Sequence, residues 1–286
     1  MQAAWSVTST DGTEIAGYEL GGTGDVVLIA HATGLCGPVY MQLAHELRPS
    51  FRVVAIDFRG HGNSGRSSSY SWDRTAEDLN AVVSYLDCER VHGFGHSMGG
   101  ASLLLAQRND ASAFASLFLY EPIVRTERDP EDEQVSNQNV LAQGARRRRD
   151  VFESRAEVMF RYASKPPFNQ VEAGALAAYV EHGFRQDADG KVRLQCAPEV
   201  EAAMFEFGRL SILEDSERLR APTVVAVGRD RAGINEARMG PPLAEALPNA
   251  TLRRYEHLGH FGPLQDPWSL ARDITRLARS ESIVSD

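Results

Sequence analysis

Short apolar runs that alternate with helical patterns fill most of the chain and restrict its possible folds. Most of the runs are continuously apolar, which is typical of strands buried in a parallel sheet. Because helical patterns separate most of them, the sequence predicts a mostly parallel sheet wrapped by helices on both faces. The predicted strands are 25–32, 51–58, 90–97, 115–122, 223–230 and 251–257, and the predicted helices are 38–48, 73–87, 98–109, 237–247 and 265–280.

One long gap interrupts this alternation. An antiparallel hairpin is predicted from the runs AWSVTST and TEIAGYEL, so the gap follows the sixth strand of the chain. It spans the residues between Glu121 and Thr223 and has helical patterning without an obvious core strand. Unstructured loops of this length are rare in compact domains. We therefore predict a helical cap over residues 123–208, inserted into a core domain of residues 1–122 and 209–286.

The charge balance and the cysteine content exclude several classes of protein. The formal net charge of −9 gives no electrostatic support for binding nucleic acid or an anionic membrane surface. The three cysteines are too few and too widely spaced for a disulfide framework or a metal knuckle. No signal peptide or membrane span is visible in the sequence. We expect a cytoplasmic monomer or homodimer whose partner is a small-molecule substrate, with no metal and no cofactor.

The segment VHGFGHSMGG contains the motif G-x-S-x-G at Gly95 to Gly99. It lies after a predicted strand and before a predicted helix, which is the context that this motif requires in a nucleophile elbow. The glycines are needed because the strand and helix backbones pass close together at such a turn. The sequence therefore predicts Ser97 as an exposed nucleophile at the positive N-terminus of the following helix.

A serine nucleophile needs an adjacent base, and His260 is the best candidate. It lies in the segment HLGHFGPLQDP, in a glycine-flanked loop after the last predicted strand. A histidine that follows the serine in the chain, after the last strand, fits the chain order of this type of triad. We interpret the neighbouring His257 as structural.

Four motifs in the same order together resemble the α/β-hydrolase superfamily. They are the elbow, the segment GHFGPLQDP, the turn DFRGHGNSG at 57–65 and the segment HATGLCG at 31–37. The resemblance covers nearly the whole chain and implies an α/β-hydrolase fold with a Ser-His-acid triad. It also implies that the backbone amides of Met98 and Thr33 form the oxyanion hole. The turn at 57–65 is structural in this superfamily, so we expect no catalytic role for it.

Two carboxylates compete for the third place in the triad. Asp230 follows a predicted strand at the point where most of the superfamily keeps its acid, although the spacing after Gly228 is one residue short. Glu121 ends the preceding predicted strand, where some relatives keep a glutamate. We favour Asp230, with Glu121 as the competing acid.

The expected pocket lies between the cap and the core. Phe168 is one of several cap aromatics suited to its wall, and Leu35 and Cys36 are expected to extend that wall. The run Arg146–Arg149 is interpreted as the solvated face of a helix. These features favour an uncharged, moderately apolar ester or lactone as the substrate.

A serine at the elbow argues against haloalkane dehalogenases and epoxide hydrolases, which the resemblance implies would need an aspartate there. The sequence therefore predicts a serine hydrolase, carboxylesterase-like or lactonase-like. Three alternatives stay open: a cofactor-free perhydrolase, a hydrolase of carbon–carbon bonds, and a small-molecule receptor on the same fold with slow or no turnover.

Overall fold

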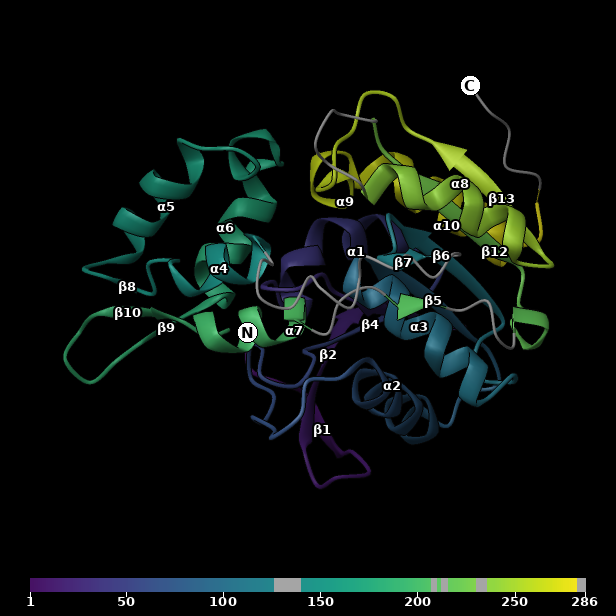
Figure 1. Cartoon of the computed structure of the whole chain (residues 1–286), viewed down its shortest axis with the longest axis horizontal. Helices are drawn as coiled ribbons and strands as arrows, with labels where there is room; N and C mark the ends of the chain where they lie inside the picture. Colours follow the sequence, from purple (N-terminus) through teal and green to yellow (C-terminus); the bar gives the residue numbers. More distant parts are fainter. Residues whose placement is uncertain (126–139, 207–209, 212–215, 230–235, 282–286) are drawn as a thin grey trace.

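The computed structural model of the protein describes residues 1–125, 140–206, 210–211, 216–229 and 236–281. Eight strands within this part of the chain form the main sheet, in the order β1-β2-β4-β3-β5-β6-β12-β13 (Figure 1). The hairpin of β1 and β2 is antiparallel and β2 pairs antiparallel with β4, whereas all pairs from β4 to β13 are parallel. The strands are β1 (Trp5–Thr8), β2 (Glu14–Gly21), β3 (Val26–Ala30), β4 (Arg52–Ile56), β5 (Val91–His96), β6 (Ser116–Tyr120), β12 (Thr223–Val227) and β13 (Ala250–Arg254).

Helices cover both faces of this sheet, as predicted. The helical elements around it are η1 (Gly37–Tyr40), α1 (Met41–Leu47), α2 (Trp72–Leu86), α3 (Met98–Asn109), η5 (Ser216–Arg218), α8 (Glu236–Ala246), α9 (Gly262–Gln265) and α10 (Pro267–Ala278). Within β3, Val27 and Ile29 pack in the apolar cluster that contains residues of α1 and α10. Val26 and Leu28 pack in the cluster that contains residues of α2, α3 and α8. The two-residue period of a strand therefore divides one apolar run between two cores.

Residues 140–206, here called the inserted segment, fold beside the main sheet (Figure 1). Three short antiparallel strands pair in the order β8-β10-β9, a small sheet that the helical patterning did not predict. Helix α6 packs on η1 and α1, which joins the segment to the main-sheet core. Its elements are α4 (Val140–Arg146), β8 (Val151–Phe152), α5 (Arg155–Ala163), η4 (Phe168–Gln170), α6 (Ala173–His182), β9 (Phe184–Gln186), β10 (Val192–Leu194) and α7 (Pro198–Glu206).

Two further strands, β7 (Val124–Arg125) and β11 (Leu210–Ser211), form a short parallel pair outside the main sheet. Among the described residues, no helix combines the length and the apolar character needed to cross a membrane.

A buried ion pair holds the turn after β4. The guanidinium of Arg59 is fully buried and donates to both carboxylate oxygens of Asp78 on α2, at 2.9 and 2.6 Å. It also pairs with Asp11 at 2.7 Å, in the turn between β1 and β2. The turn at 57–65 is therefore held by a structural cation, which gives a physical reason for the arginine of its motif.

We predict that Asp78→Ala lowers the free energy of unfolding by about 3 kcal/mol, because it leaves a buried guanidinium without its main partner. Glu77→Ala is the matched control on the same helix, since its pair with Arg74 is partly exposed to solvent. We expect the control to cost about 0.5 kcal/mol. Urea unfolding of both variants measures the difference, and equal losses would contradict this account of the turn.

Candidate active site

The main chain at Ser97 adopts a left-handed conformation where β5 ends and α3 begins. Its dihedral angles are φ 54° and ψ −114°, a conformation that costs free energy for a residue with a side chain. The neighbouring glycines make the turn possible: a Cβ atom on Gly99 would lie 2.1 Å from the carbonyl oxygen of Ala30. The N–H of Ser97 donates to the carbonyl of Tyr120 at 2.9 Å, which ties the turn to the end of β6.

Helix α3 begins directly after the serine, at Met98. The first N–H groups of a helix have no partner within the helix, and the helix dipole makes this end partly positive. The amide of Met98 is therefore at the helix end that attracts a negatively charged oxygen.

The carboxylate of Glu121 lies against the His260 imidazole. Its Oε2 is 2.7 Å from Nδ1 of His260, and its Oε1 accepts the N–H of Gly228 at 2.8 Å. Glu121 is 1% exposed, so the contact is shielded from water. Its backbone also has a positive φ, 42°, directly after β6. Both carboxylate oxygens are thus held by the protein, and a buried carboxylate needs such partners.

Only one of the two candidate acids lies within the described part of the chain. The carboxylate beside His260 is that of Glu121, which the sequence analysis ranked second. Asp230, which we favoured, lies outside the described residues. The choice of Asp230 therefore stays a prediction, and the contact of Glu121 with His260 favours Glu121 instead.

Ser97 follows β5 and His260 follows β13, with β6 and β12 between these two strands, and no hydrogen bond joins the two side chains in the described structure. The side chain of His96, the residue before Ser97, lies between the two loops: its ring centroid is 5.0 Å from that of His260. Hydrogen bonds between catalytic groups often tighten only when substrate binds.

The loop after β3, residues 31–36 and here called the β3 loop, contains the second amide predicted for the oxyanion hole, that of Thr33. The N–H of Ala32 donates to the hydroxyl of Tyr40 at 3.1 Å, and the N–H of Gly34 donates to Nε2 of His61 at 3.0 Å. Within the described residues the N–H of Thr33, between them, has no hydrogen-bond partner. This is the amide that the sequence analysis placed in the oxyanion hole.

Three fully buried histidines shape this region in their neutral form. His31 accepts the N–H of Phe58 at its Nε2, and His61 accepts the N–H of Gly34. Burial lowers the pKa of His61 to about 4 and holds the pKa of His31 and of His96 well below the usual value. Each ring therefore keeps one nitrogen as an acceptor and one as a donor.

Tyr40 and His96 form a buried hydrogen-bond chain that the sequence analysis did not predict. The hydroxyl of Tyr40 accepts the N–H of Ala32 and donates to Nδ1 of His96 at 2.7 Å. Nε2 of His96 in turn donates to the backbone carbonyl of His260 at 2.7 Å. This chain connects the β3 loop with the loop that carries His260, and it passes beside Ser97. A histidine within the elbow motif was the only sequence signal for it.

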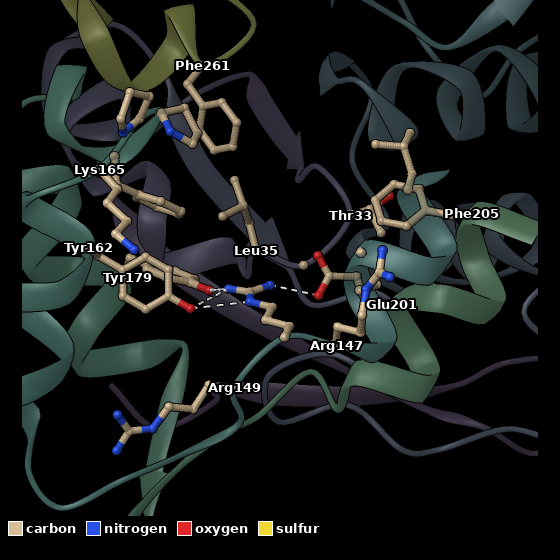
Figure 2. Close-up of a pocket in the computed structure, with 18 of the residues that line it drawn as sticks. Thr33, Leu35, Arg147, Arg149, Tyr162, Lys165, Tyr179, Glu201, Phe205 and Phe261 are labelled. Atoms are coloured by element: carbon tan, nitrogen blue, oxygen red, sulfur yellow. Dashed lines mark hydrogen bonds and ion pairs between the residues drawn. The ribbon is translucent and has the colours of Figure 1, made fainter. Parts of the chain in front are cut away.

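A cavity of about 520 Å³ lies between the β3 loop and the inserted segment (Figure 2). Thr33 and Leu35 line it from the β3 loop, and Phe261, next to His260, lines it from the loop before α9. Phe168 lines it from the inserted segment. Cys36, which we expected on this wall, is not one of its lining residues. It is buried beneath the loop, and burial raises the pKa of its thiol.

Arg148 is part of the cavity wall, so the interpretation of Arg146–Arg149 as a solvated face was wrong for this residue. Its guanidinium pairs with Glu201 at 2.7 Å and donates to the hydroxyls of Tyr162 and Tyr179. Arg146, by contrast, is exposed and pairs with Glu199 on α7. Among the described residues, no group of three or more histidine, cysteine or acidic side chains is arranged to hold a metal ion.

Comparison with known proteins identifies the family. The family model described as "Alpha/beta hydrolase family" matches residues 26–270, and the chain belongs to this family. It is 30% identical to the non-heme chloroperoxidase CPO-A1 of Kitasatospora aureofaciens, over 88% of this chain and 90% of that one. It is 26% identical to the bifunctional esterase/perhydrolase DCH of Acinetobacter calcoaceticus, over 96% and 99% of the two chains. These relatives are enzymes, and the protein is an α/β-hydrolase enzyme.

The fold is shared with solved structures of the same class. The crystal structure of E-2-(acetamidomethylene)succinate hydrolase superposes with a TM-score of 0.83, covering 96% of this chain and 98% of that chain. Its sequence identity to this chain is 18%, so the likeness concerns the fold alone.

We predict that the protein loses stability as the pH falls from 6.5 towards 5. The unfolded chain binds protons at its histidines below about pH 6.5, whereas His61 stays neutral in the fold down to about pH 4. The neutral state of His61 alone should lower the free energy of unfolding by about 2 kcal/mol at pH 5. Urea unfolding at both pH values measures the loss.

His61→Gln should reduce this pH dependence, because glutamine does not titrate. His45→Gln, at an exposed position on α1, is the control and should retain it. An unchanged pH dependence in His61→Gln would contradict the buried neutral state of this histidine.

Proposed function

We propose that the protein is a serine hydrolase that cleaves an ester or lactone through a triad of Ser97, His260 and Glu121. The observation that carries the proposal is the 2.7 Å contact between Glu121 Oε2 and His260 Nδ1, buried beside the elbow. A carboxylate in this position orients the imidazole and stabilises its protonated form. A Ser-His-acid triad is also what the resemblance to the family implies, and the chain belongs to that family.

The proposed reaction proceeds by two acyl transfers. Ser97 attacks the carbonyl carbon of the substrate while Nε2 of His260 takes the hydroxyl proton. The amides of Met98 and Thr33 stabilise the tetrahedral oxyanion. His260 then returns the proton to the leaving alcohol, which leaves an acyl group on Ser97. Water, activated by His260, attacks this acyl-enzyme, releases the acid and regenerates the serine.

We propose that the inserted segment acts as the cap that selects the substrate. Phe168 and Phe261 give the cavity an apolar wall, and about 520 Å³ is enough for a small substrate. The body of the substrate is therefore expected to be moderately apolar.

A second candidate function is perhydrolysis. It is favoured by the names of two relatives, a chloroperoxidase and a bifunctional esterase/perhydrolase. In this reaction hydrogen peroxide replaces water in the second transfer: its oxygen attacks the acyl-enzyme, and a peracid leaves as Ser97 is regenerated. Bromination of monochlorodimedone in acetate, bromide and hydrogen peroxide, in which the peracid oxidises bromide, distinguishes this activity from plain ester hydrolysis.

We predict that Ser97→Ala abolishes turnover of p-nitrophenyl esters and that Glu121→Gln lowers kcat by about 10³-fold or more, since glutamine does not stabilise the imidazolium. Burst kinetics on esters of increasing chain length measure both effects. Asp230→Asn is the matched control and should retain most of the wild-type kcat. A large loss in Asp230→Asn with little effect in Glu121→Gln would reverse the assignment of the acid.

Absence of a burst and of turnover on every ester would instead favour the receptor alternative. Turnover that survives in Ser97→Ala would contradict the proposed nucleophile.

We predict that Tyr40→Phe lowers kcat by about tenfold with little change in KM. The substitution removes the hydroxyl that joins the Ala32 amide to His96, and so loosens the geometry around the oxyanion and the base. Tyr255→Phe is the matched control, because it removes a buried hydroxyl bonded to Asp273 on α10. Both variants should lose about 1–3 kcal/mol of stability. Equal kcat in the two variants would show that the Tyr40 chain is only structural.

A further inference from the structure

The cavity beside the active site carries a charge of opposite sign to the rest of the protein. The whole chain has a formal net charge of −9. Among the described residues that line the cavity, however, there is one carboxylate, that of Glu201, and several cations: Arg147, Arg148, Arg149, Arg161 and Lys165. A cluster of one sign at a cleft focuses the electric field there and raises the local concentration of ligands of the opposite sign.

Two of these cations have protein partners that balance their charge. Arg148 pairs with Glu201 at 2.7 Å, and Arg149 pairs with Glu157 at 2.7 Å. Figure 2 shows the Arg149 side chain directed away from Leu35 and Thr33. These two arginines therefore contribute little net charge to the cavity.

The remaining three, here called the cationic rim, are Arg147, Arg161 and Lys165. Within the described residues none of their side chains makes an ion pair, and all three are exposed. Arg161 is on α5 and Lys165 follows it by four residues, so both come from one side of the inserted segment. In Figure 2, Lys165 and Thr33 lie on opposite sides of Leu35. A substrate whose carbonyl is at Thr33 would thus extend across Leu35 towards Lys165.

The cavity floor between these ends also offers proton donors. The hydroxyls of Tyr162 and Tyr179 accept hydrogen bonds from the guanidinium of Arg148. Each hydroxyl keeps its own proton, which it can donate to an oxygen of a ligand. Because Arg148 is held by Glu201 and by both tyrosines, these donors are fixed in place before a ligand binds.

We infer that the substrate carries a carboxylate, which Lys165 and Arg161 of the cationic rim bind while the ester or lactone carbonyl lies at Thr33. The inference rests on the proposed hydrolase function and revises the expectation of an uncharged substrate. The apolar wall of Phe168 and Phe261 then contacts the body of the substrate between its two polar ends. The half-ester of a dicarboxylic acid has this chemistry, and the carboxylate belongs to either the acyl or the alcohol part.

Two pairs of esters that differ by one methyl group test the inference. The first pair is p-nitrophenyl hydrogen glutarate and p-nitrophenyl methyl glutarate, with the charge on the acyl part. The second pair is 4-acetoxybenzoate and methyl 4-acetoxybenzoate, with the charge on the leaving group. We expect kcat/KM for the anionic member of at least one pair to exceed that of its neutral partner by about tenfold at low salt. About 0.5 M NaCl should reduce this preference, because salt screens exposed charges.

Substitutions in the cationic rim test whether the preference for anionic esters comes from this site or from the overall charge of the protein. Lys165→Met and Arg161→Gln should each reduce the preference by about threefold, as expected for an exposed charge pair. Arg147→Gln should reduce it less, because Figure 2 shows Arg147 on the Thr33 side of Leu35, away from Lys165. Arg254→Gln on β13 is the matched control: it removes the same charge from an exposed position outside the cavity lining. It should leave the preference unchanged.

The outcomes distinguish this inference from the proposed function. Ser97-dependent hydrolysis of both members of each pair at equal kcat/KM would overturn the carboxylate site alone, as would equal losses in the rim variants and in Arg254→Gln. Turnover of no ester, or turnover that persists in Ser97→Ala, would overturn the hydrolase proposal itself. A preference for the anionic ester that is lost only in the rim variants supports the inference.

Discussion

The close approach of backbones at Ser97 is the constraint on which the rest of the site depends. A left-handed residue between β5 and α3 directs its side chain away from both elements, and Gly99 allows the helix to pass within contact distance of β3. The same turn places the first amide of α3 next to the serine. One local conformation therefore places the proposed nucleophile next to a partly positive helix end, which would stabilise the oxyanion formed by its attack.

Around this turn, loops that follow three parallel strands are joined by neutral buried groups rather than by ions. Tyr40 and His96 connect the β3 loop to the carbonyl of His260, and His61 holds Gly34. Neutral imidazoles suit this task because each has one donor and one acceptor and carries no charge that burial would penalise. The carboxylate of Glu121 lies beside His260, where the proposed reaction requires one.

Most of the fold and part of the site were predictable from the sequence. Five of the predicted strands, β3, β4, β5, β6 and β12, are almost wholly buried, and the elbow motif lies between a strand and a helix, so their positions could be predicted. The strands β8, β9 and β10 have two or three residues each, too short to produce a period. Glu121 was ranked second because its contact with His260 follows from a positive φ after β6, which residue spacing does not encode. Arg148 was missed because its partners come from distant parts of the inserted segment.

The identity of the nucleophile is the central claim, and covalent labelling tests it most directly. The wild-type protein is treated with diisopropyl fluorophosphate, digested, and analysed by mass spectrometry. The account predicts a single adduct on the peptide that contains Ser97, formed in step with loss of ester turnover. An unlabelled Ser97 in a protein that hydrolyses esters, or an adduct on another residue that accompanies inactivation, would contradict it.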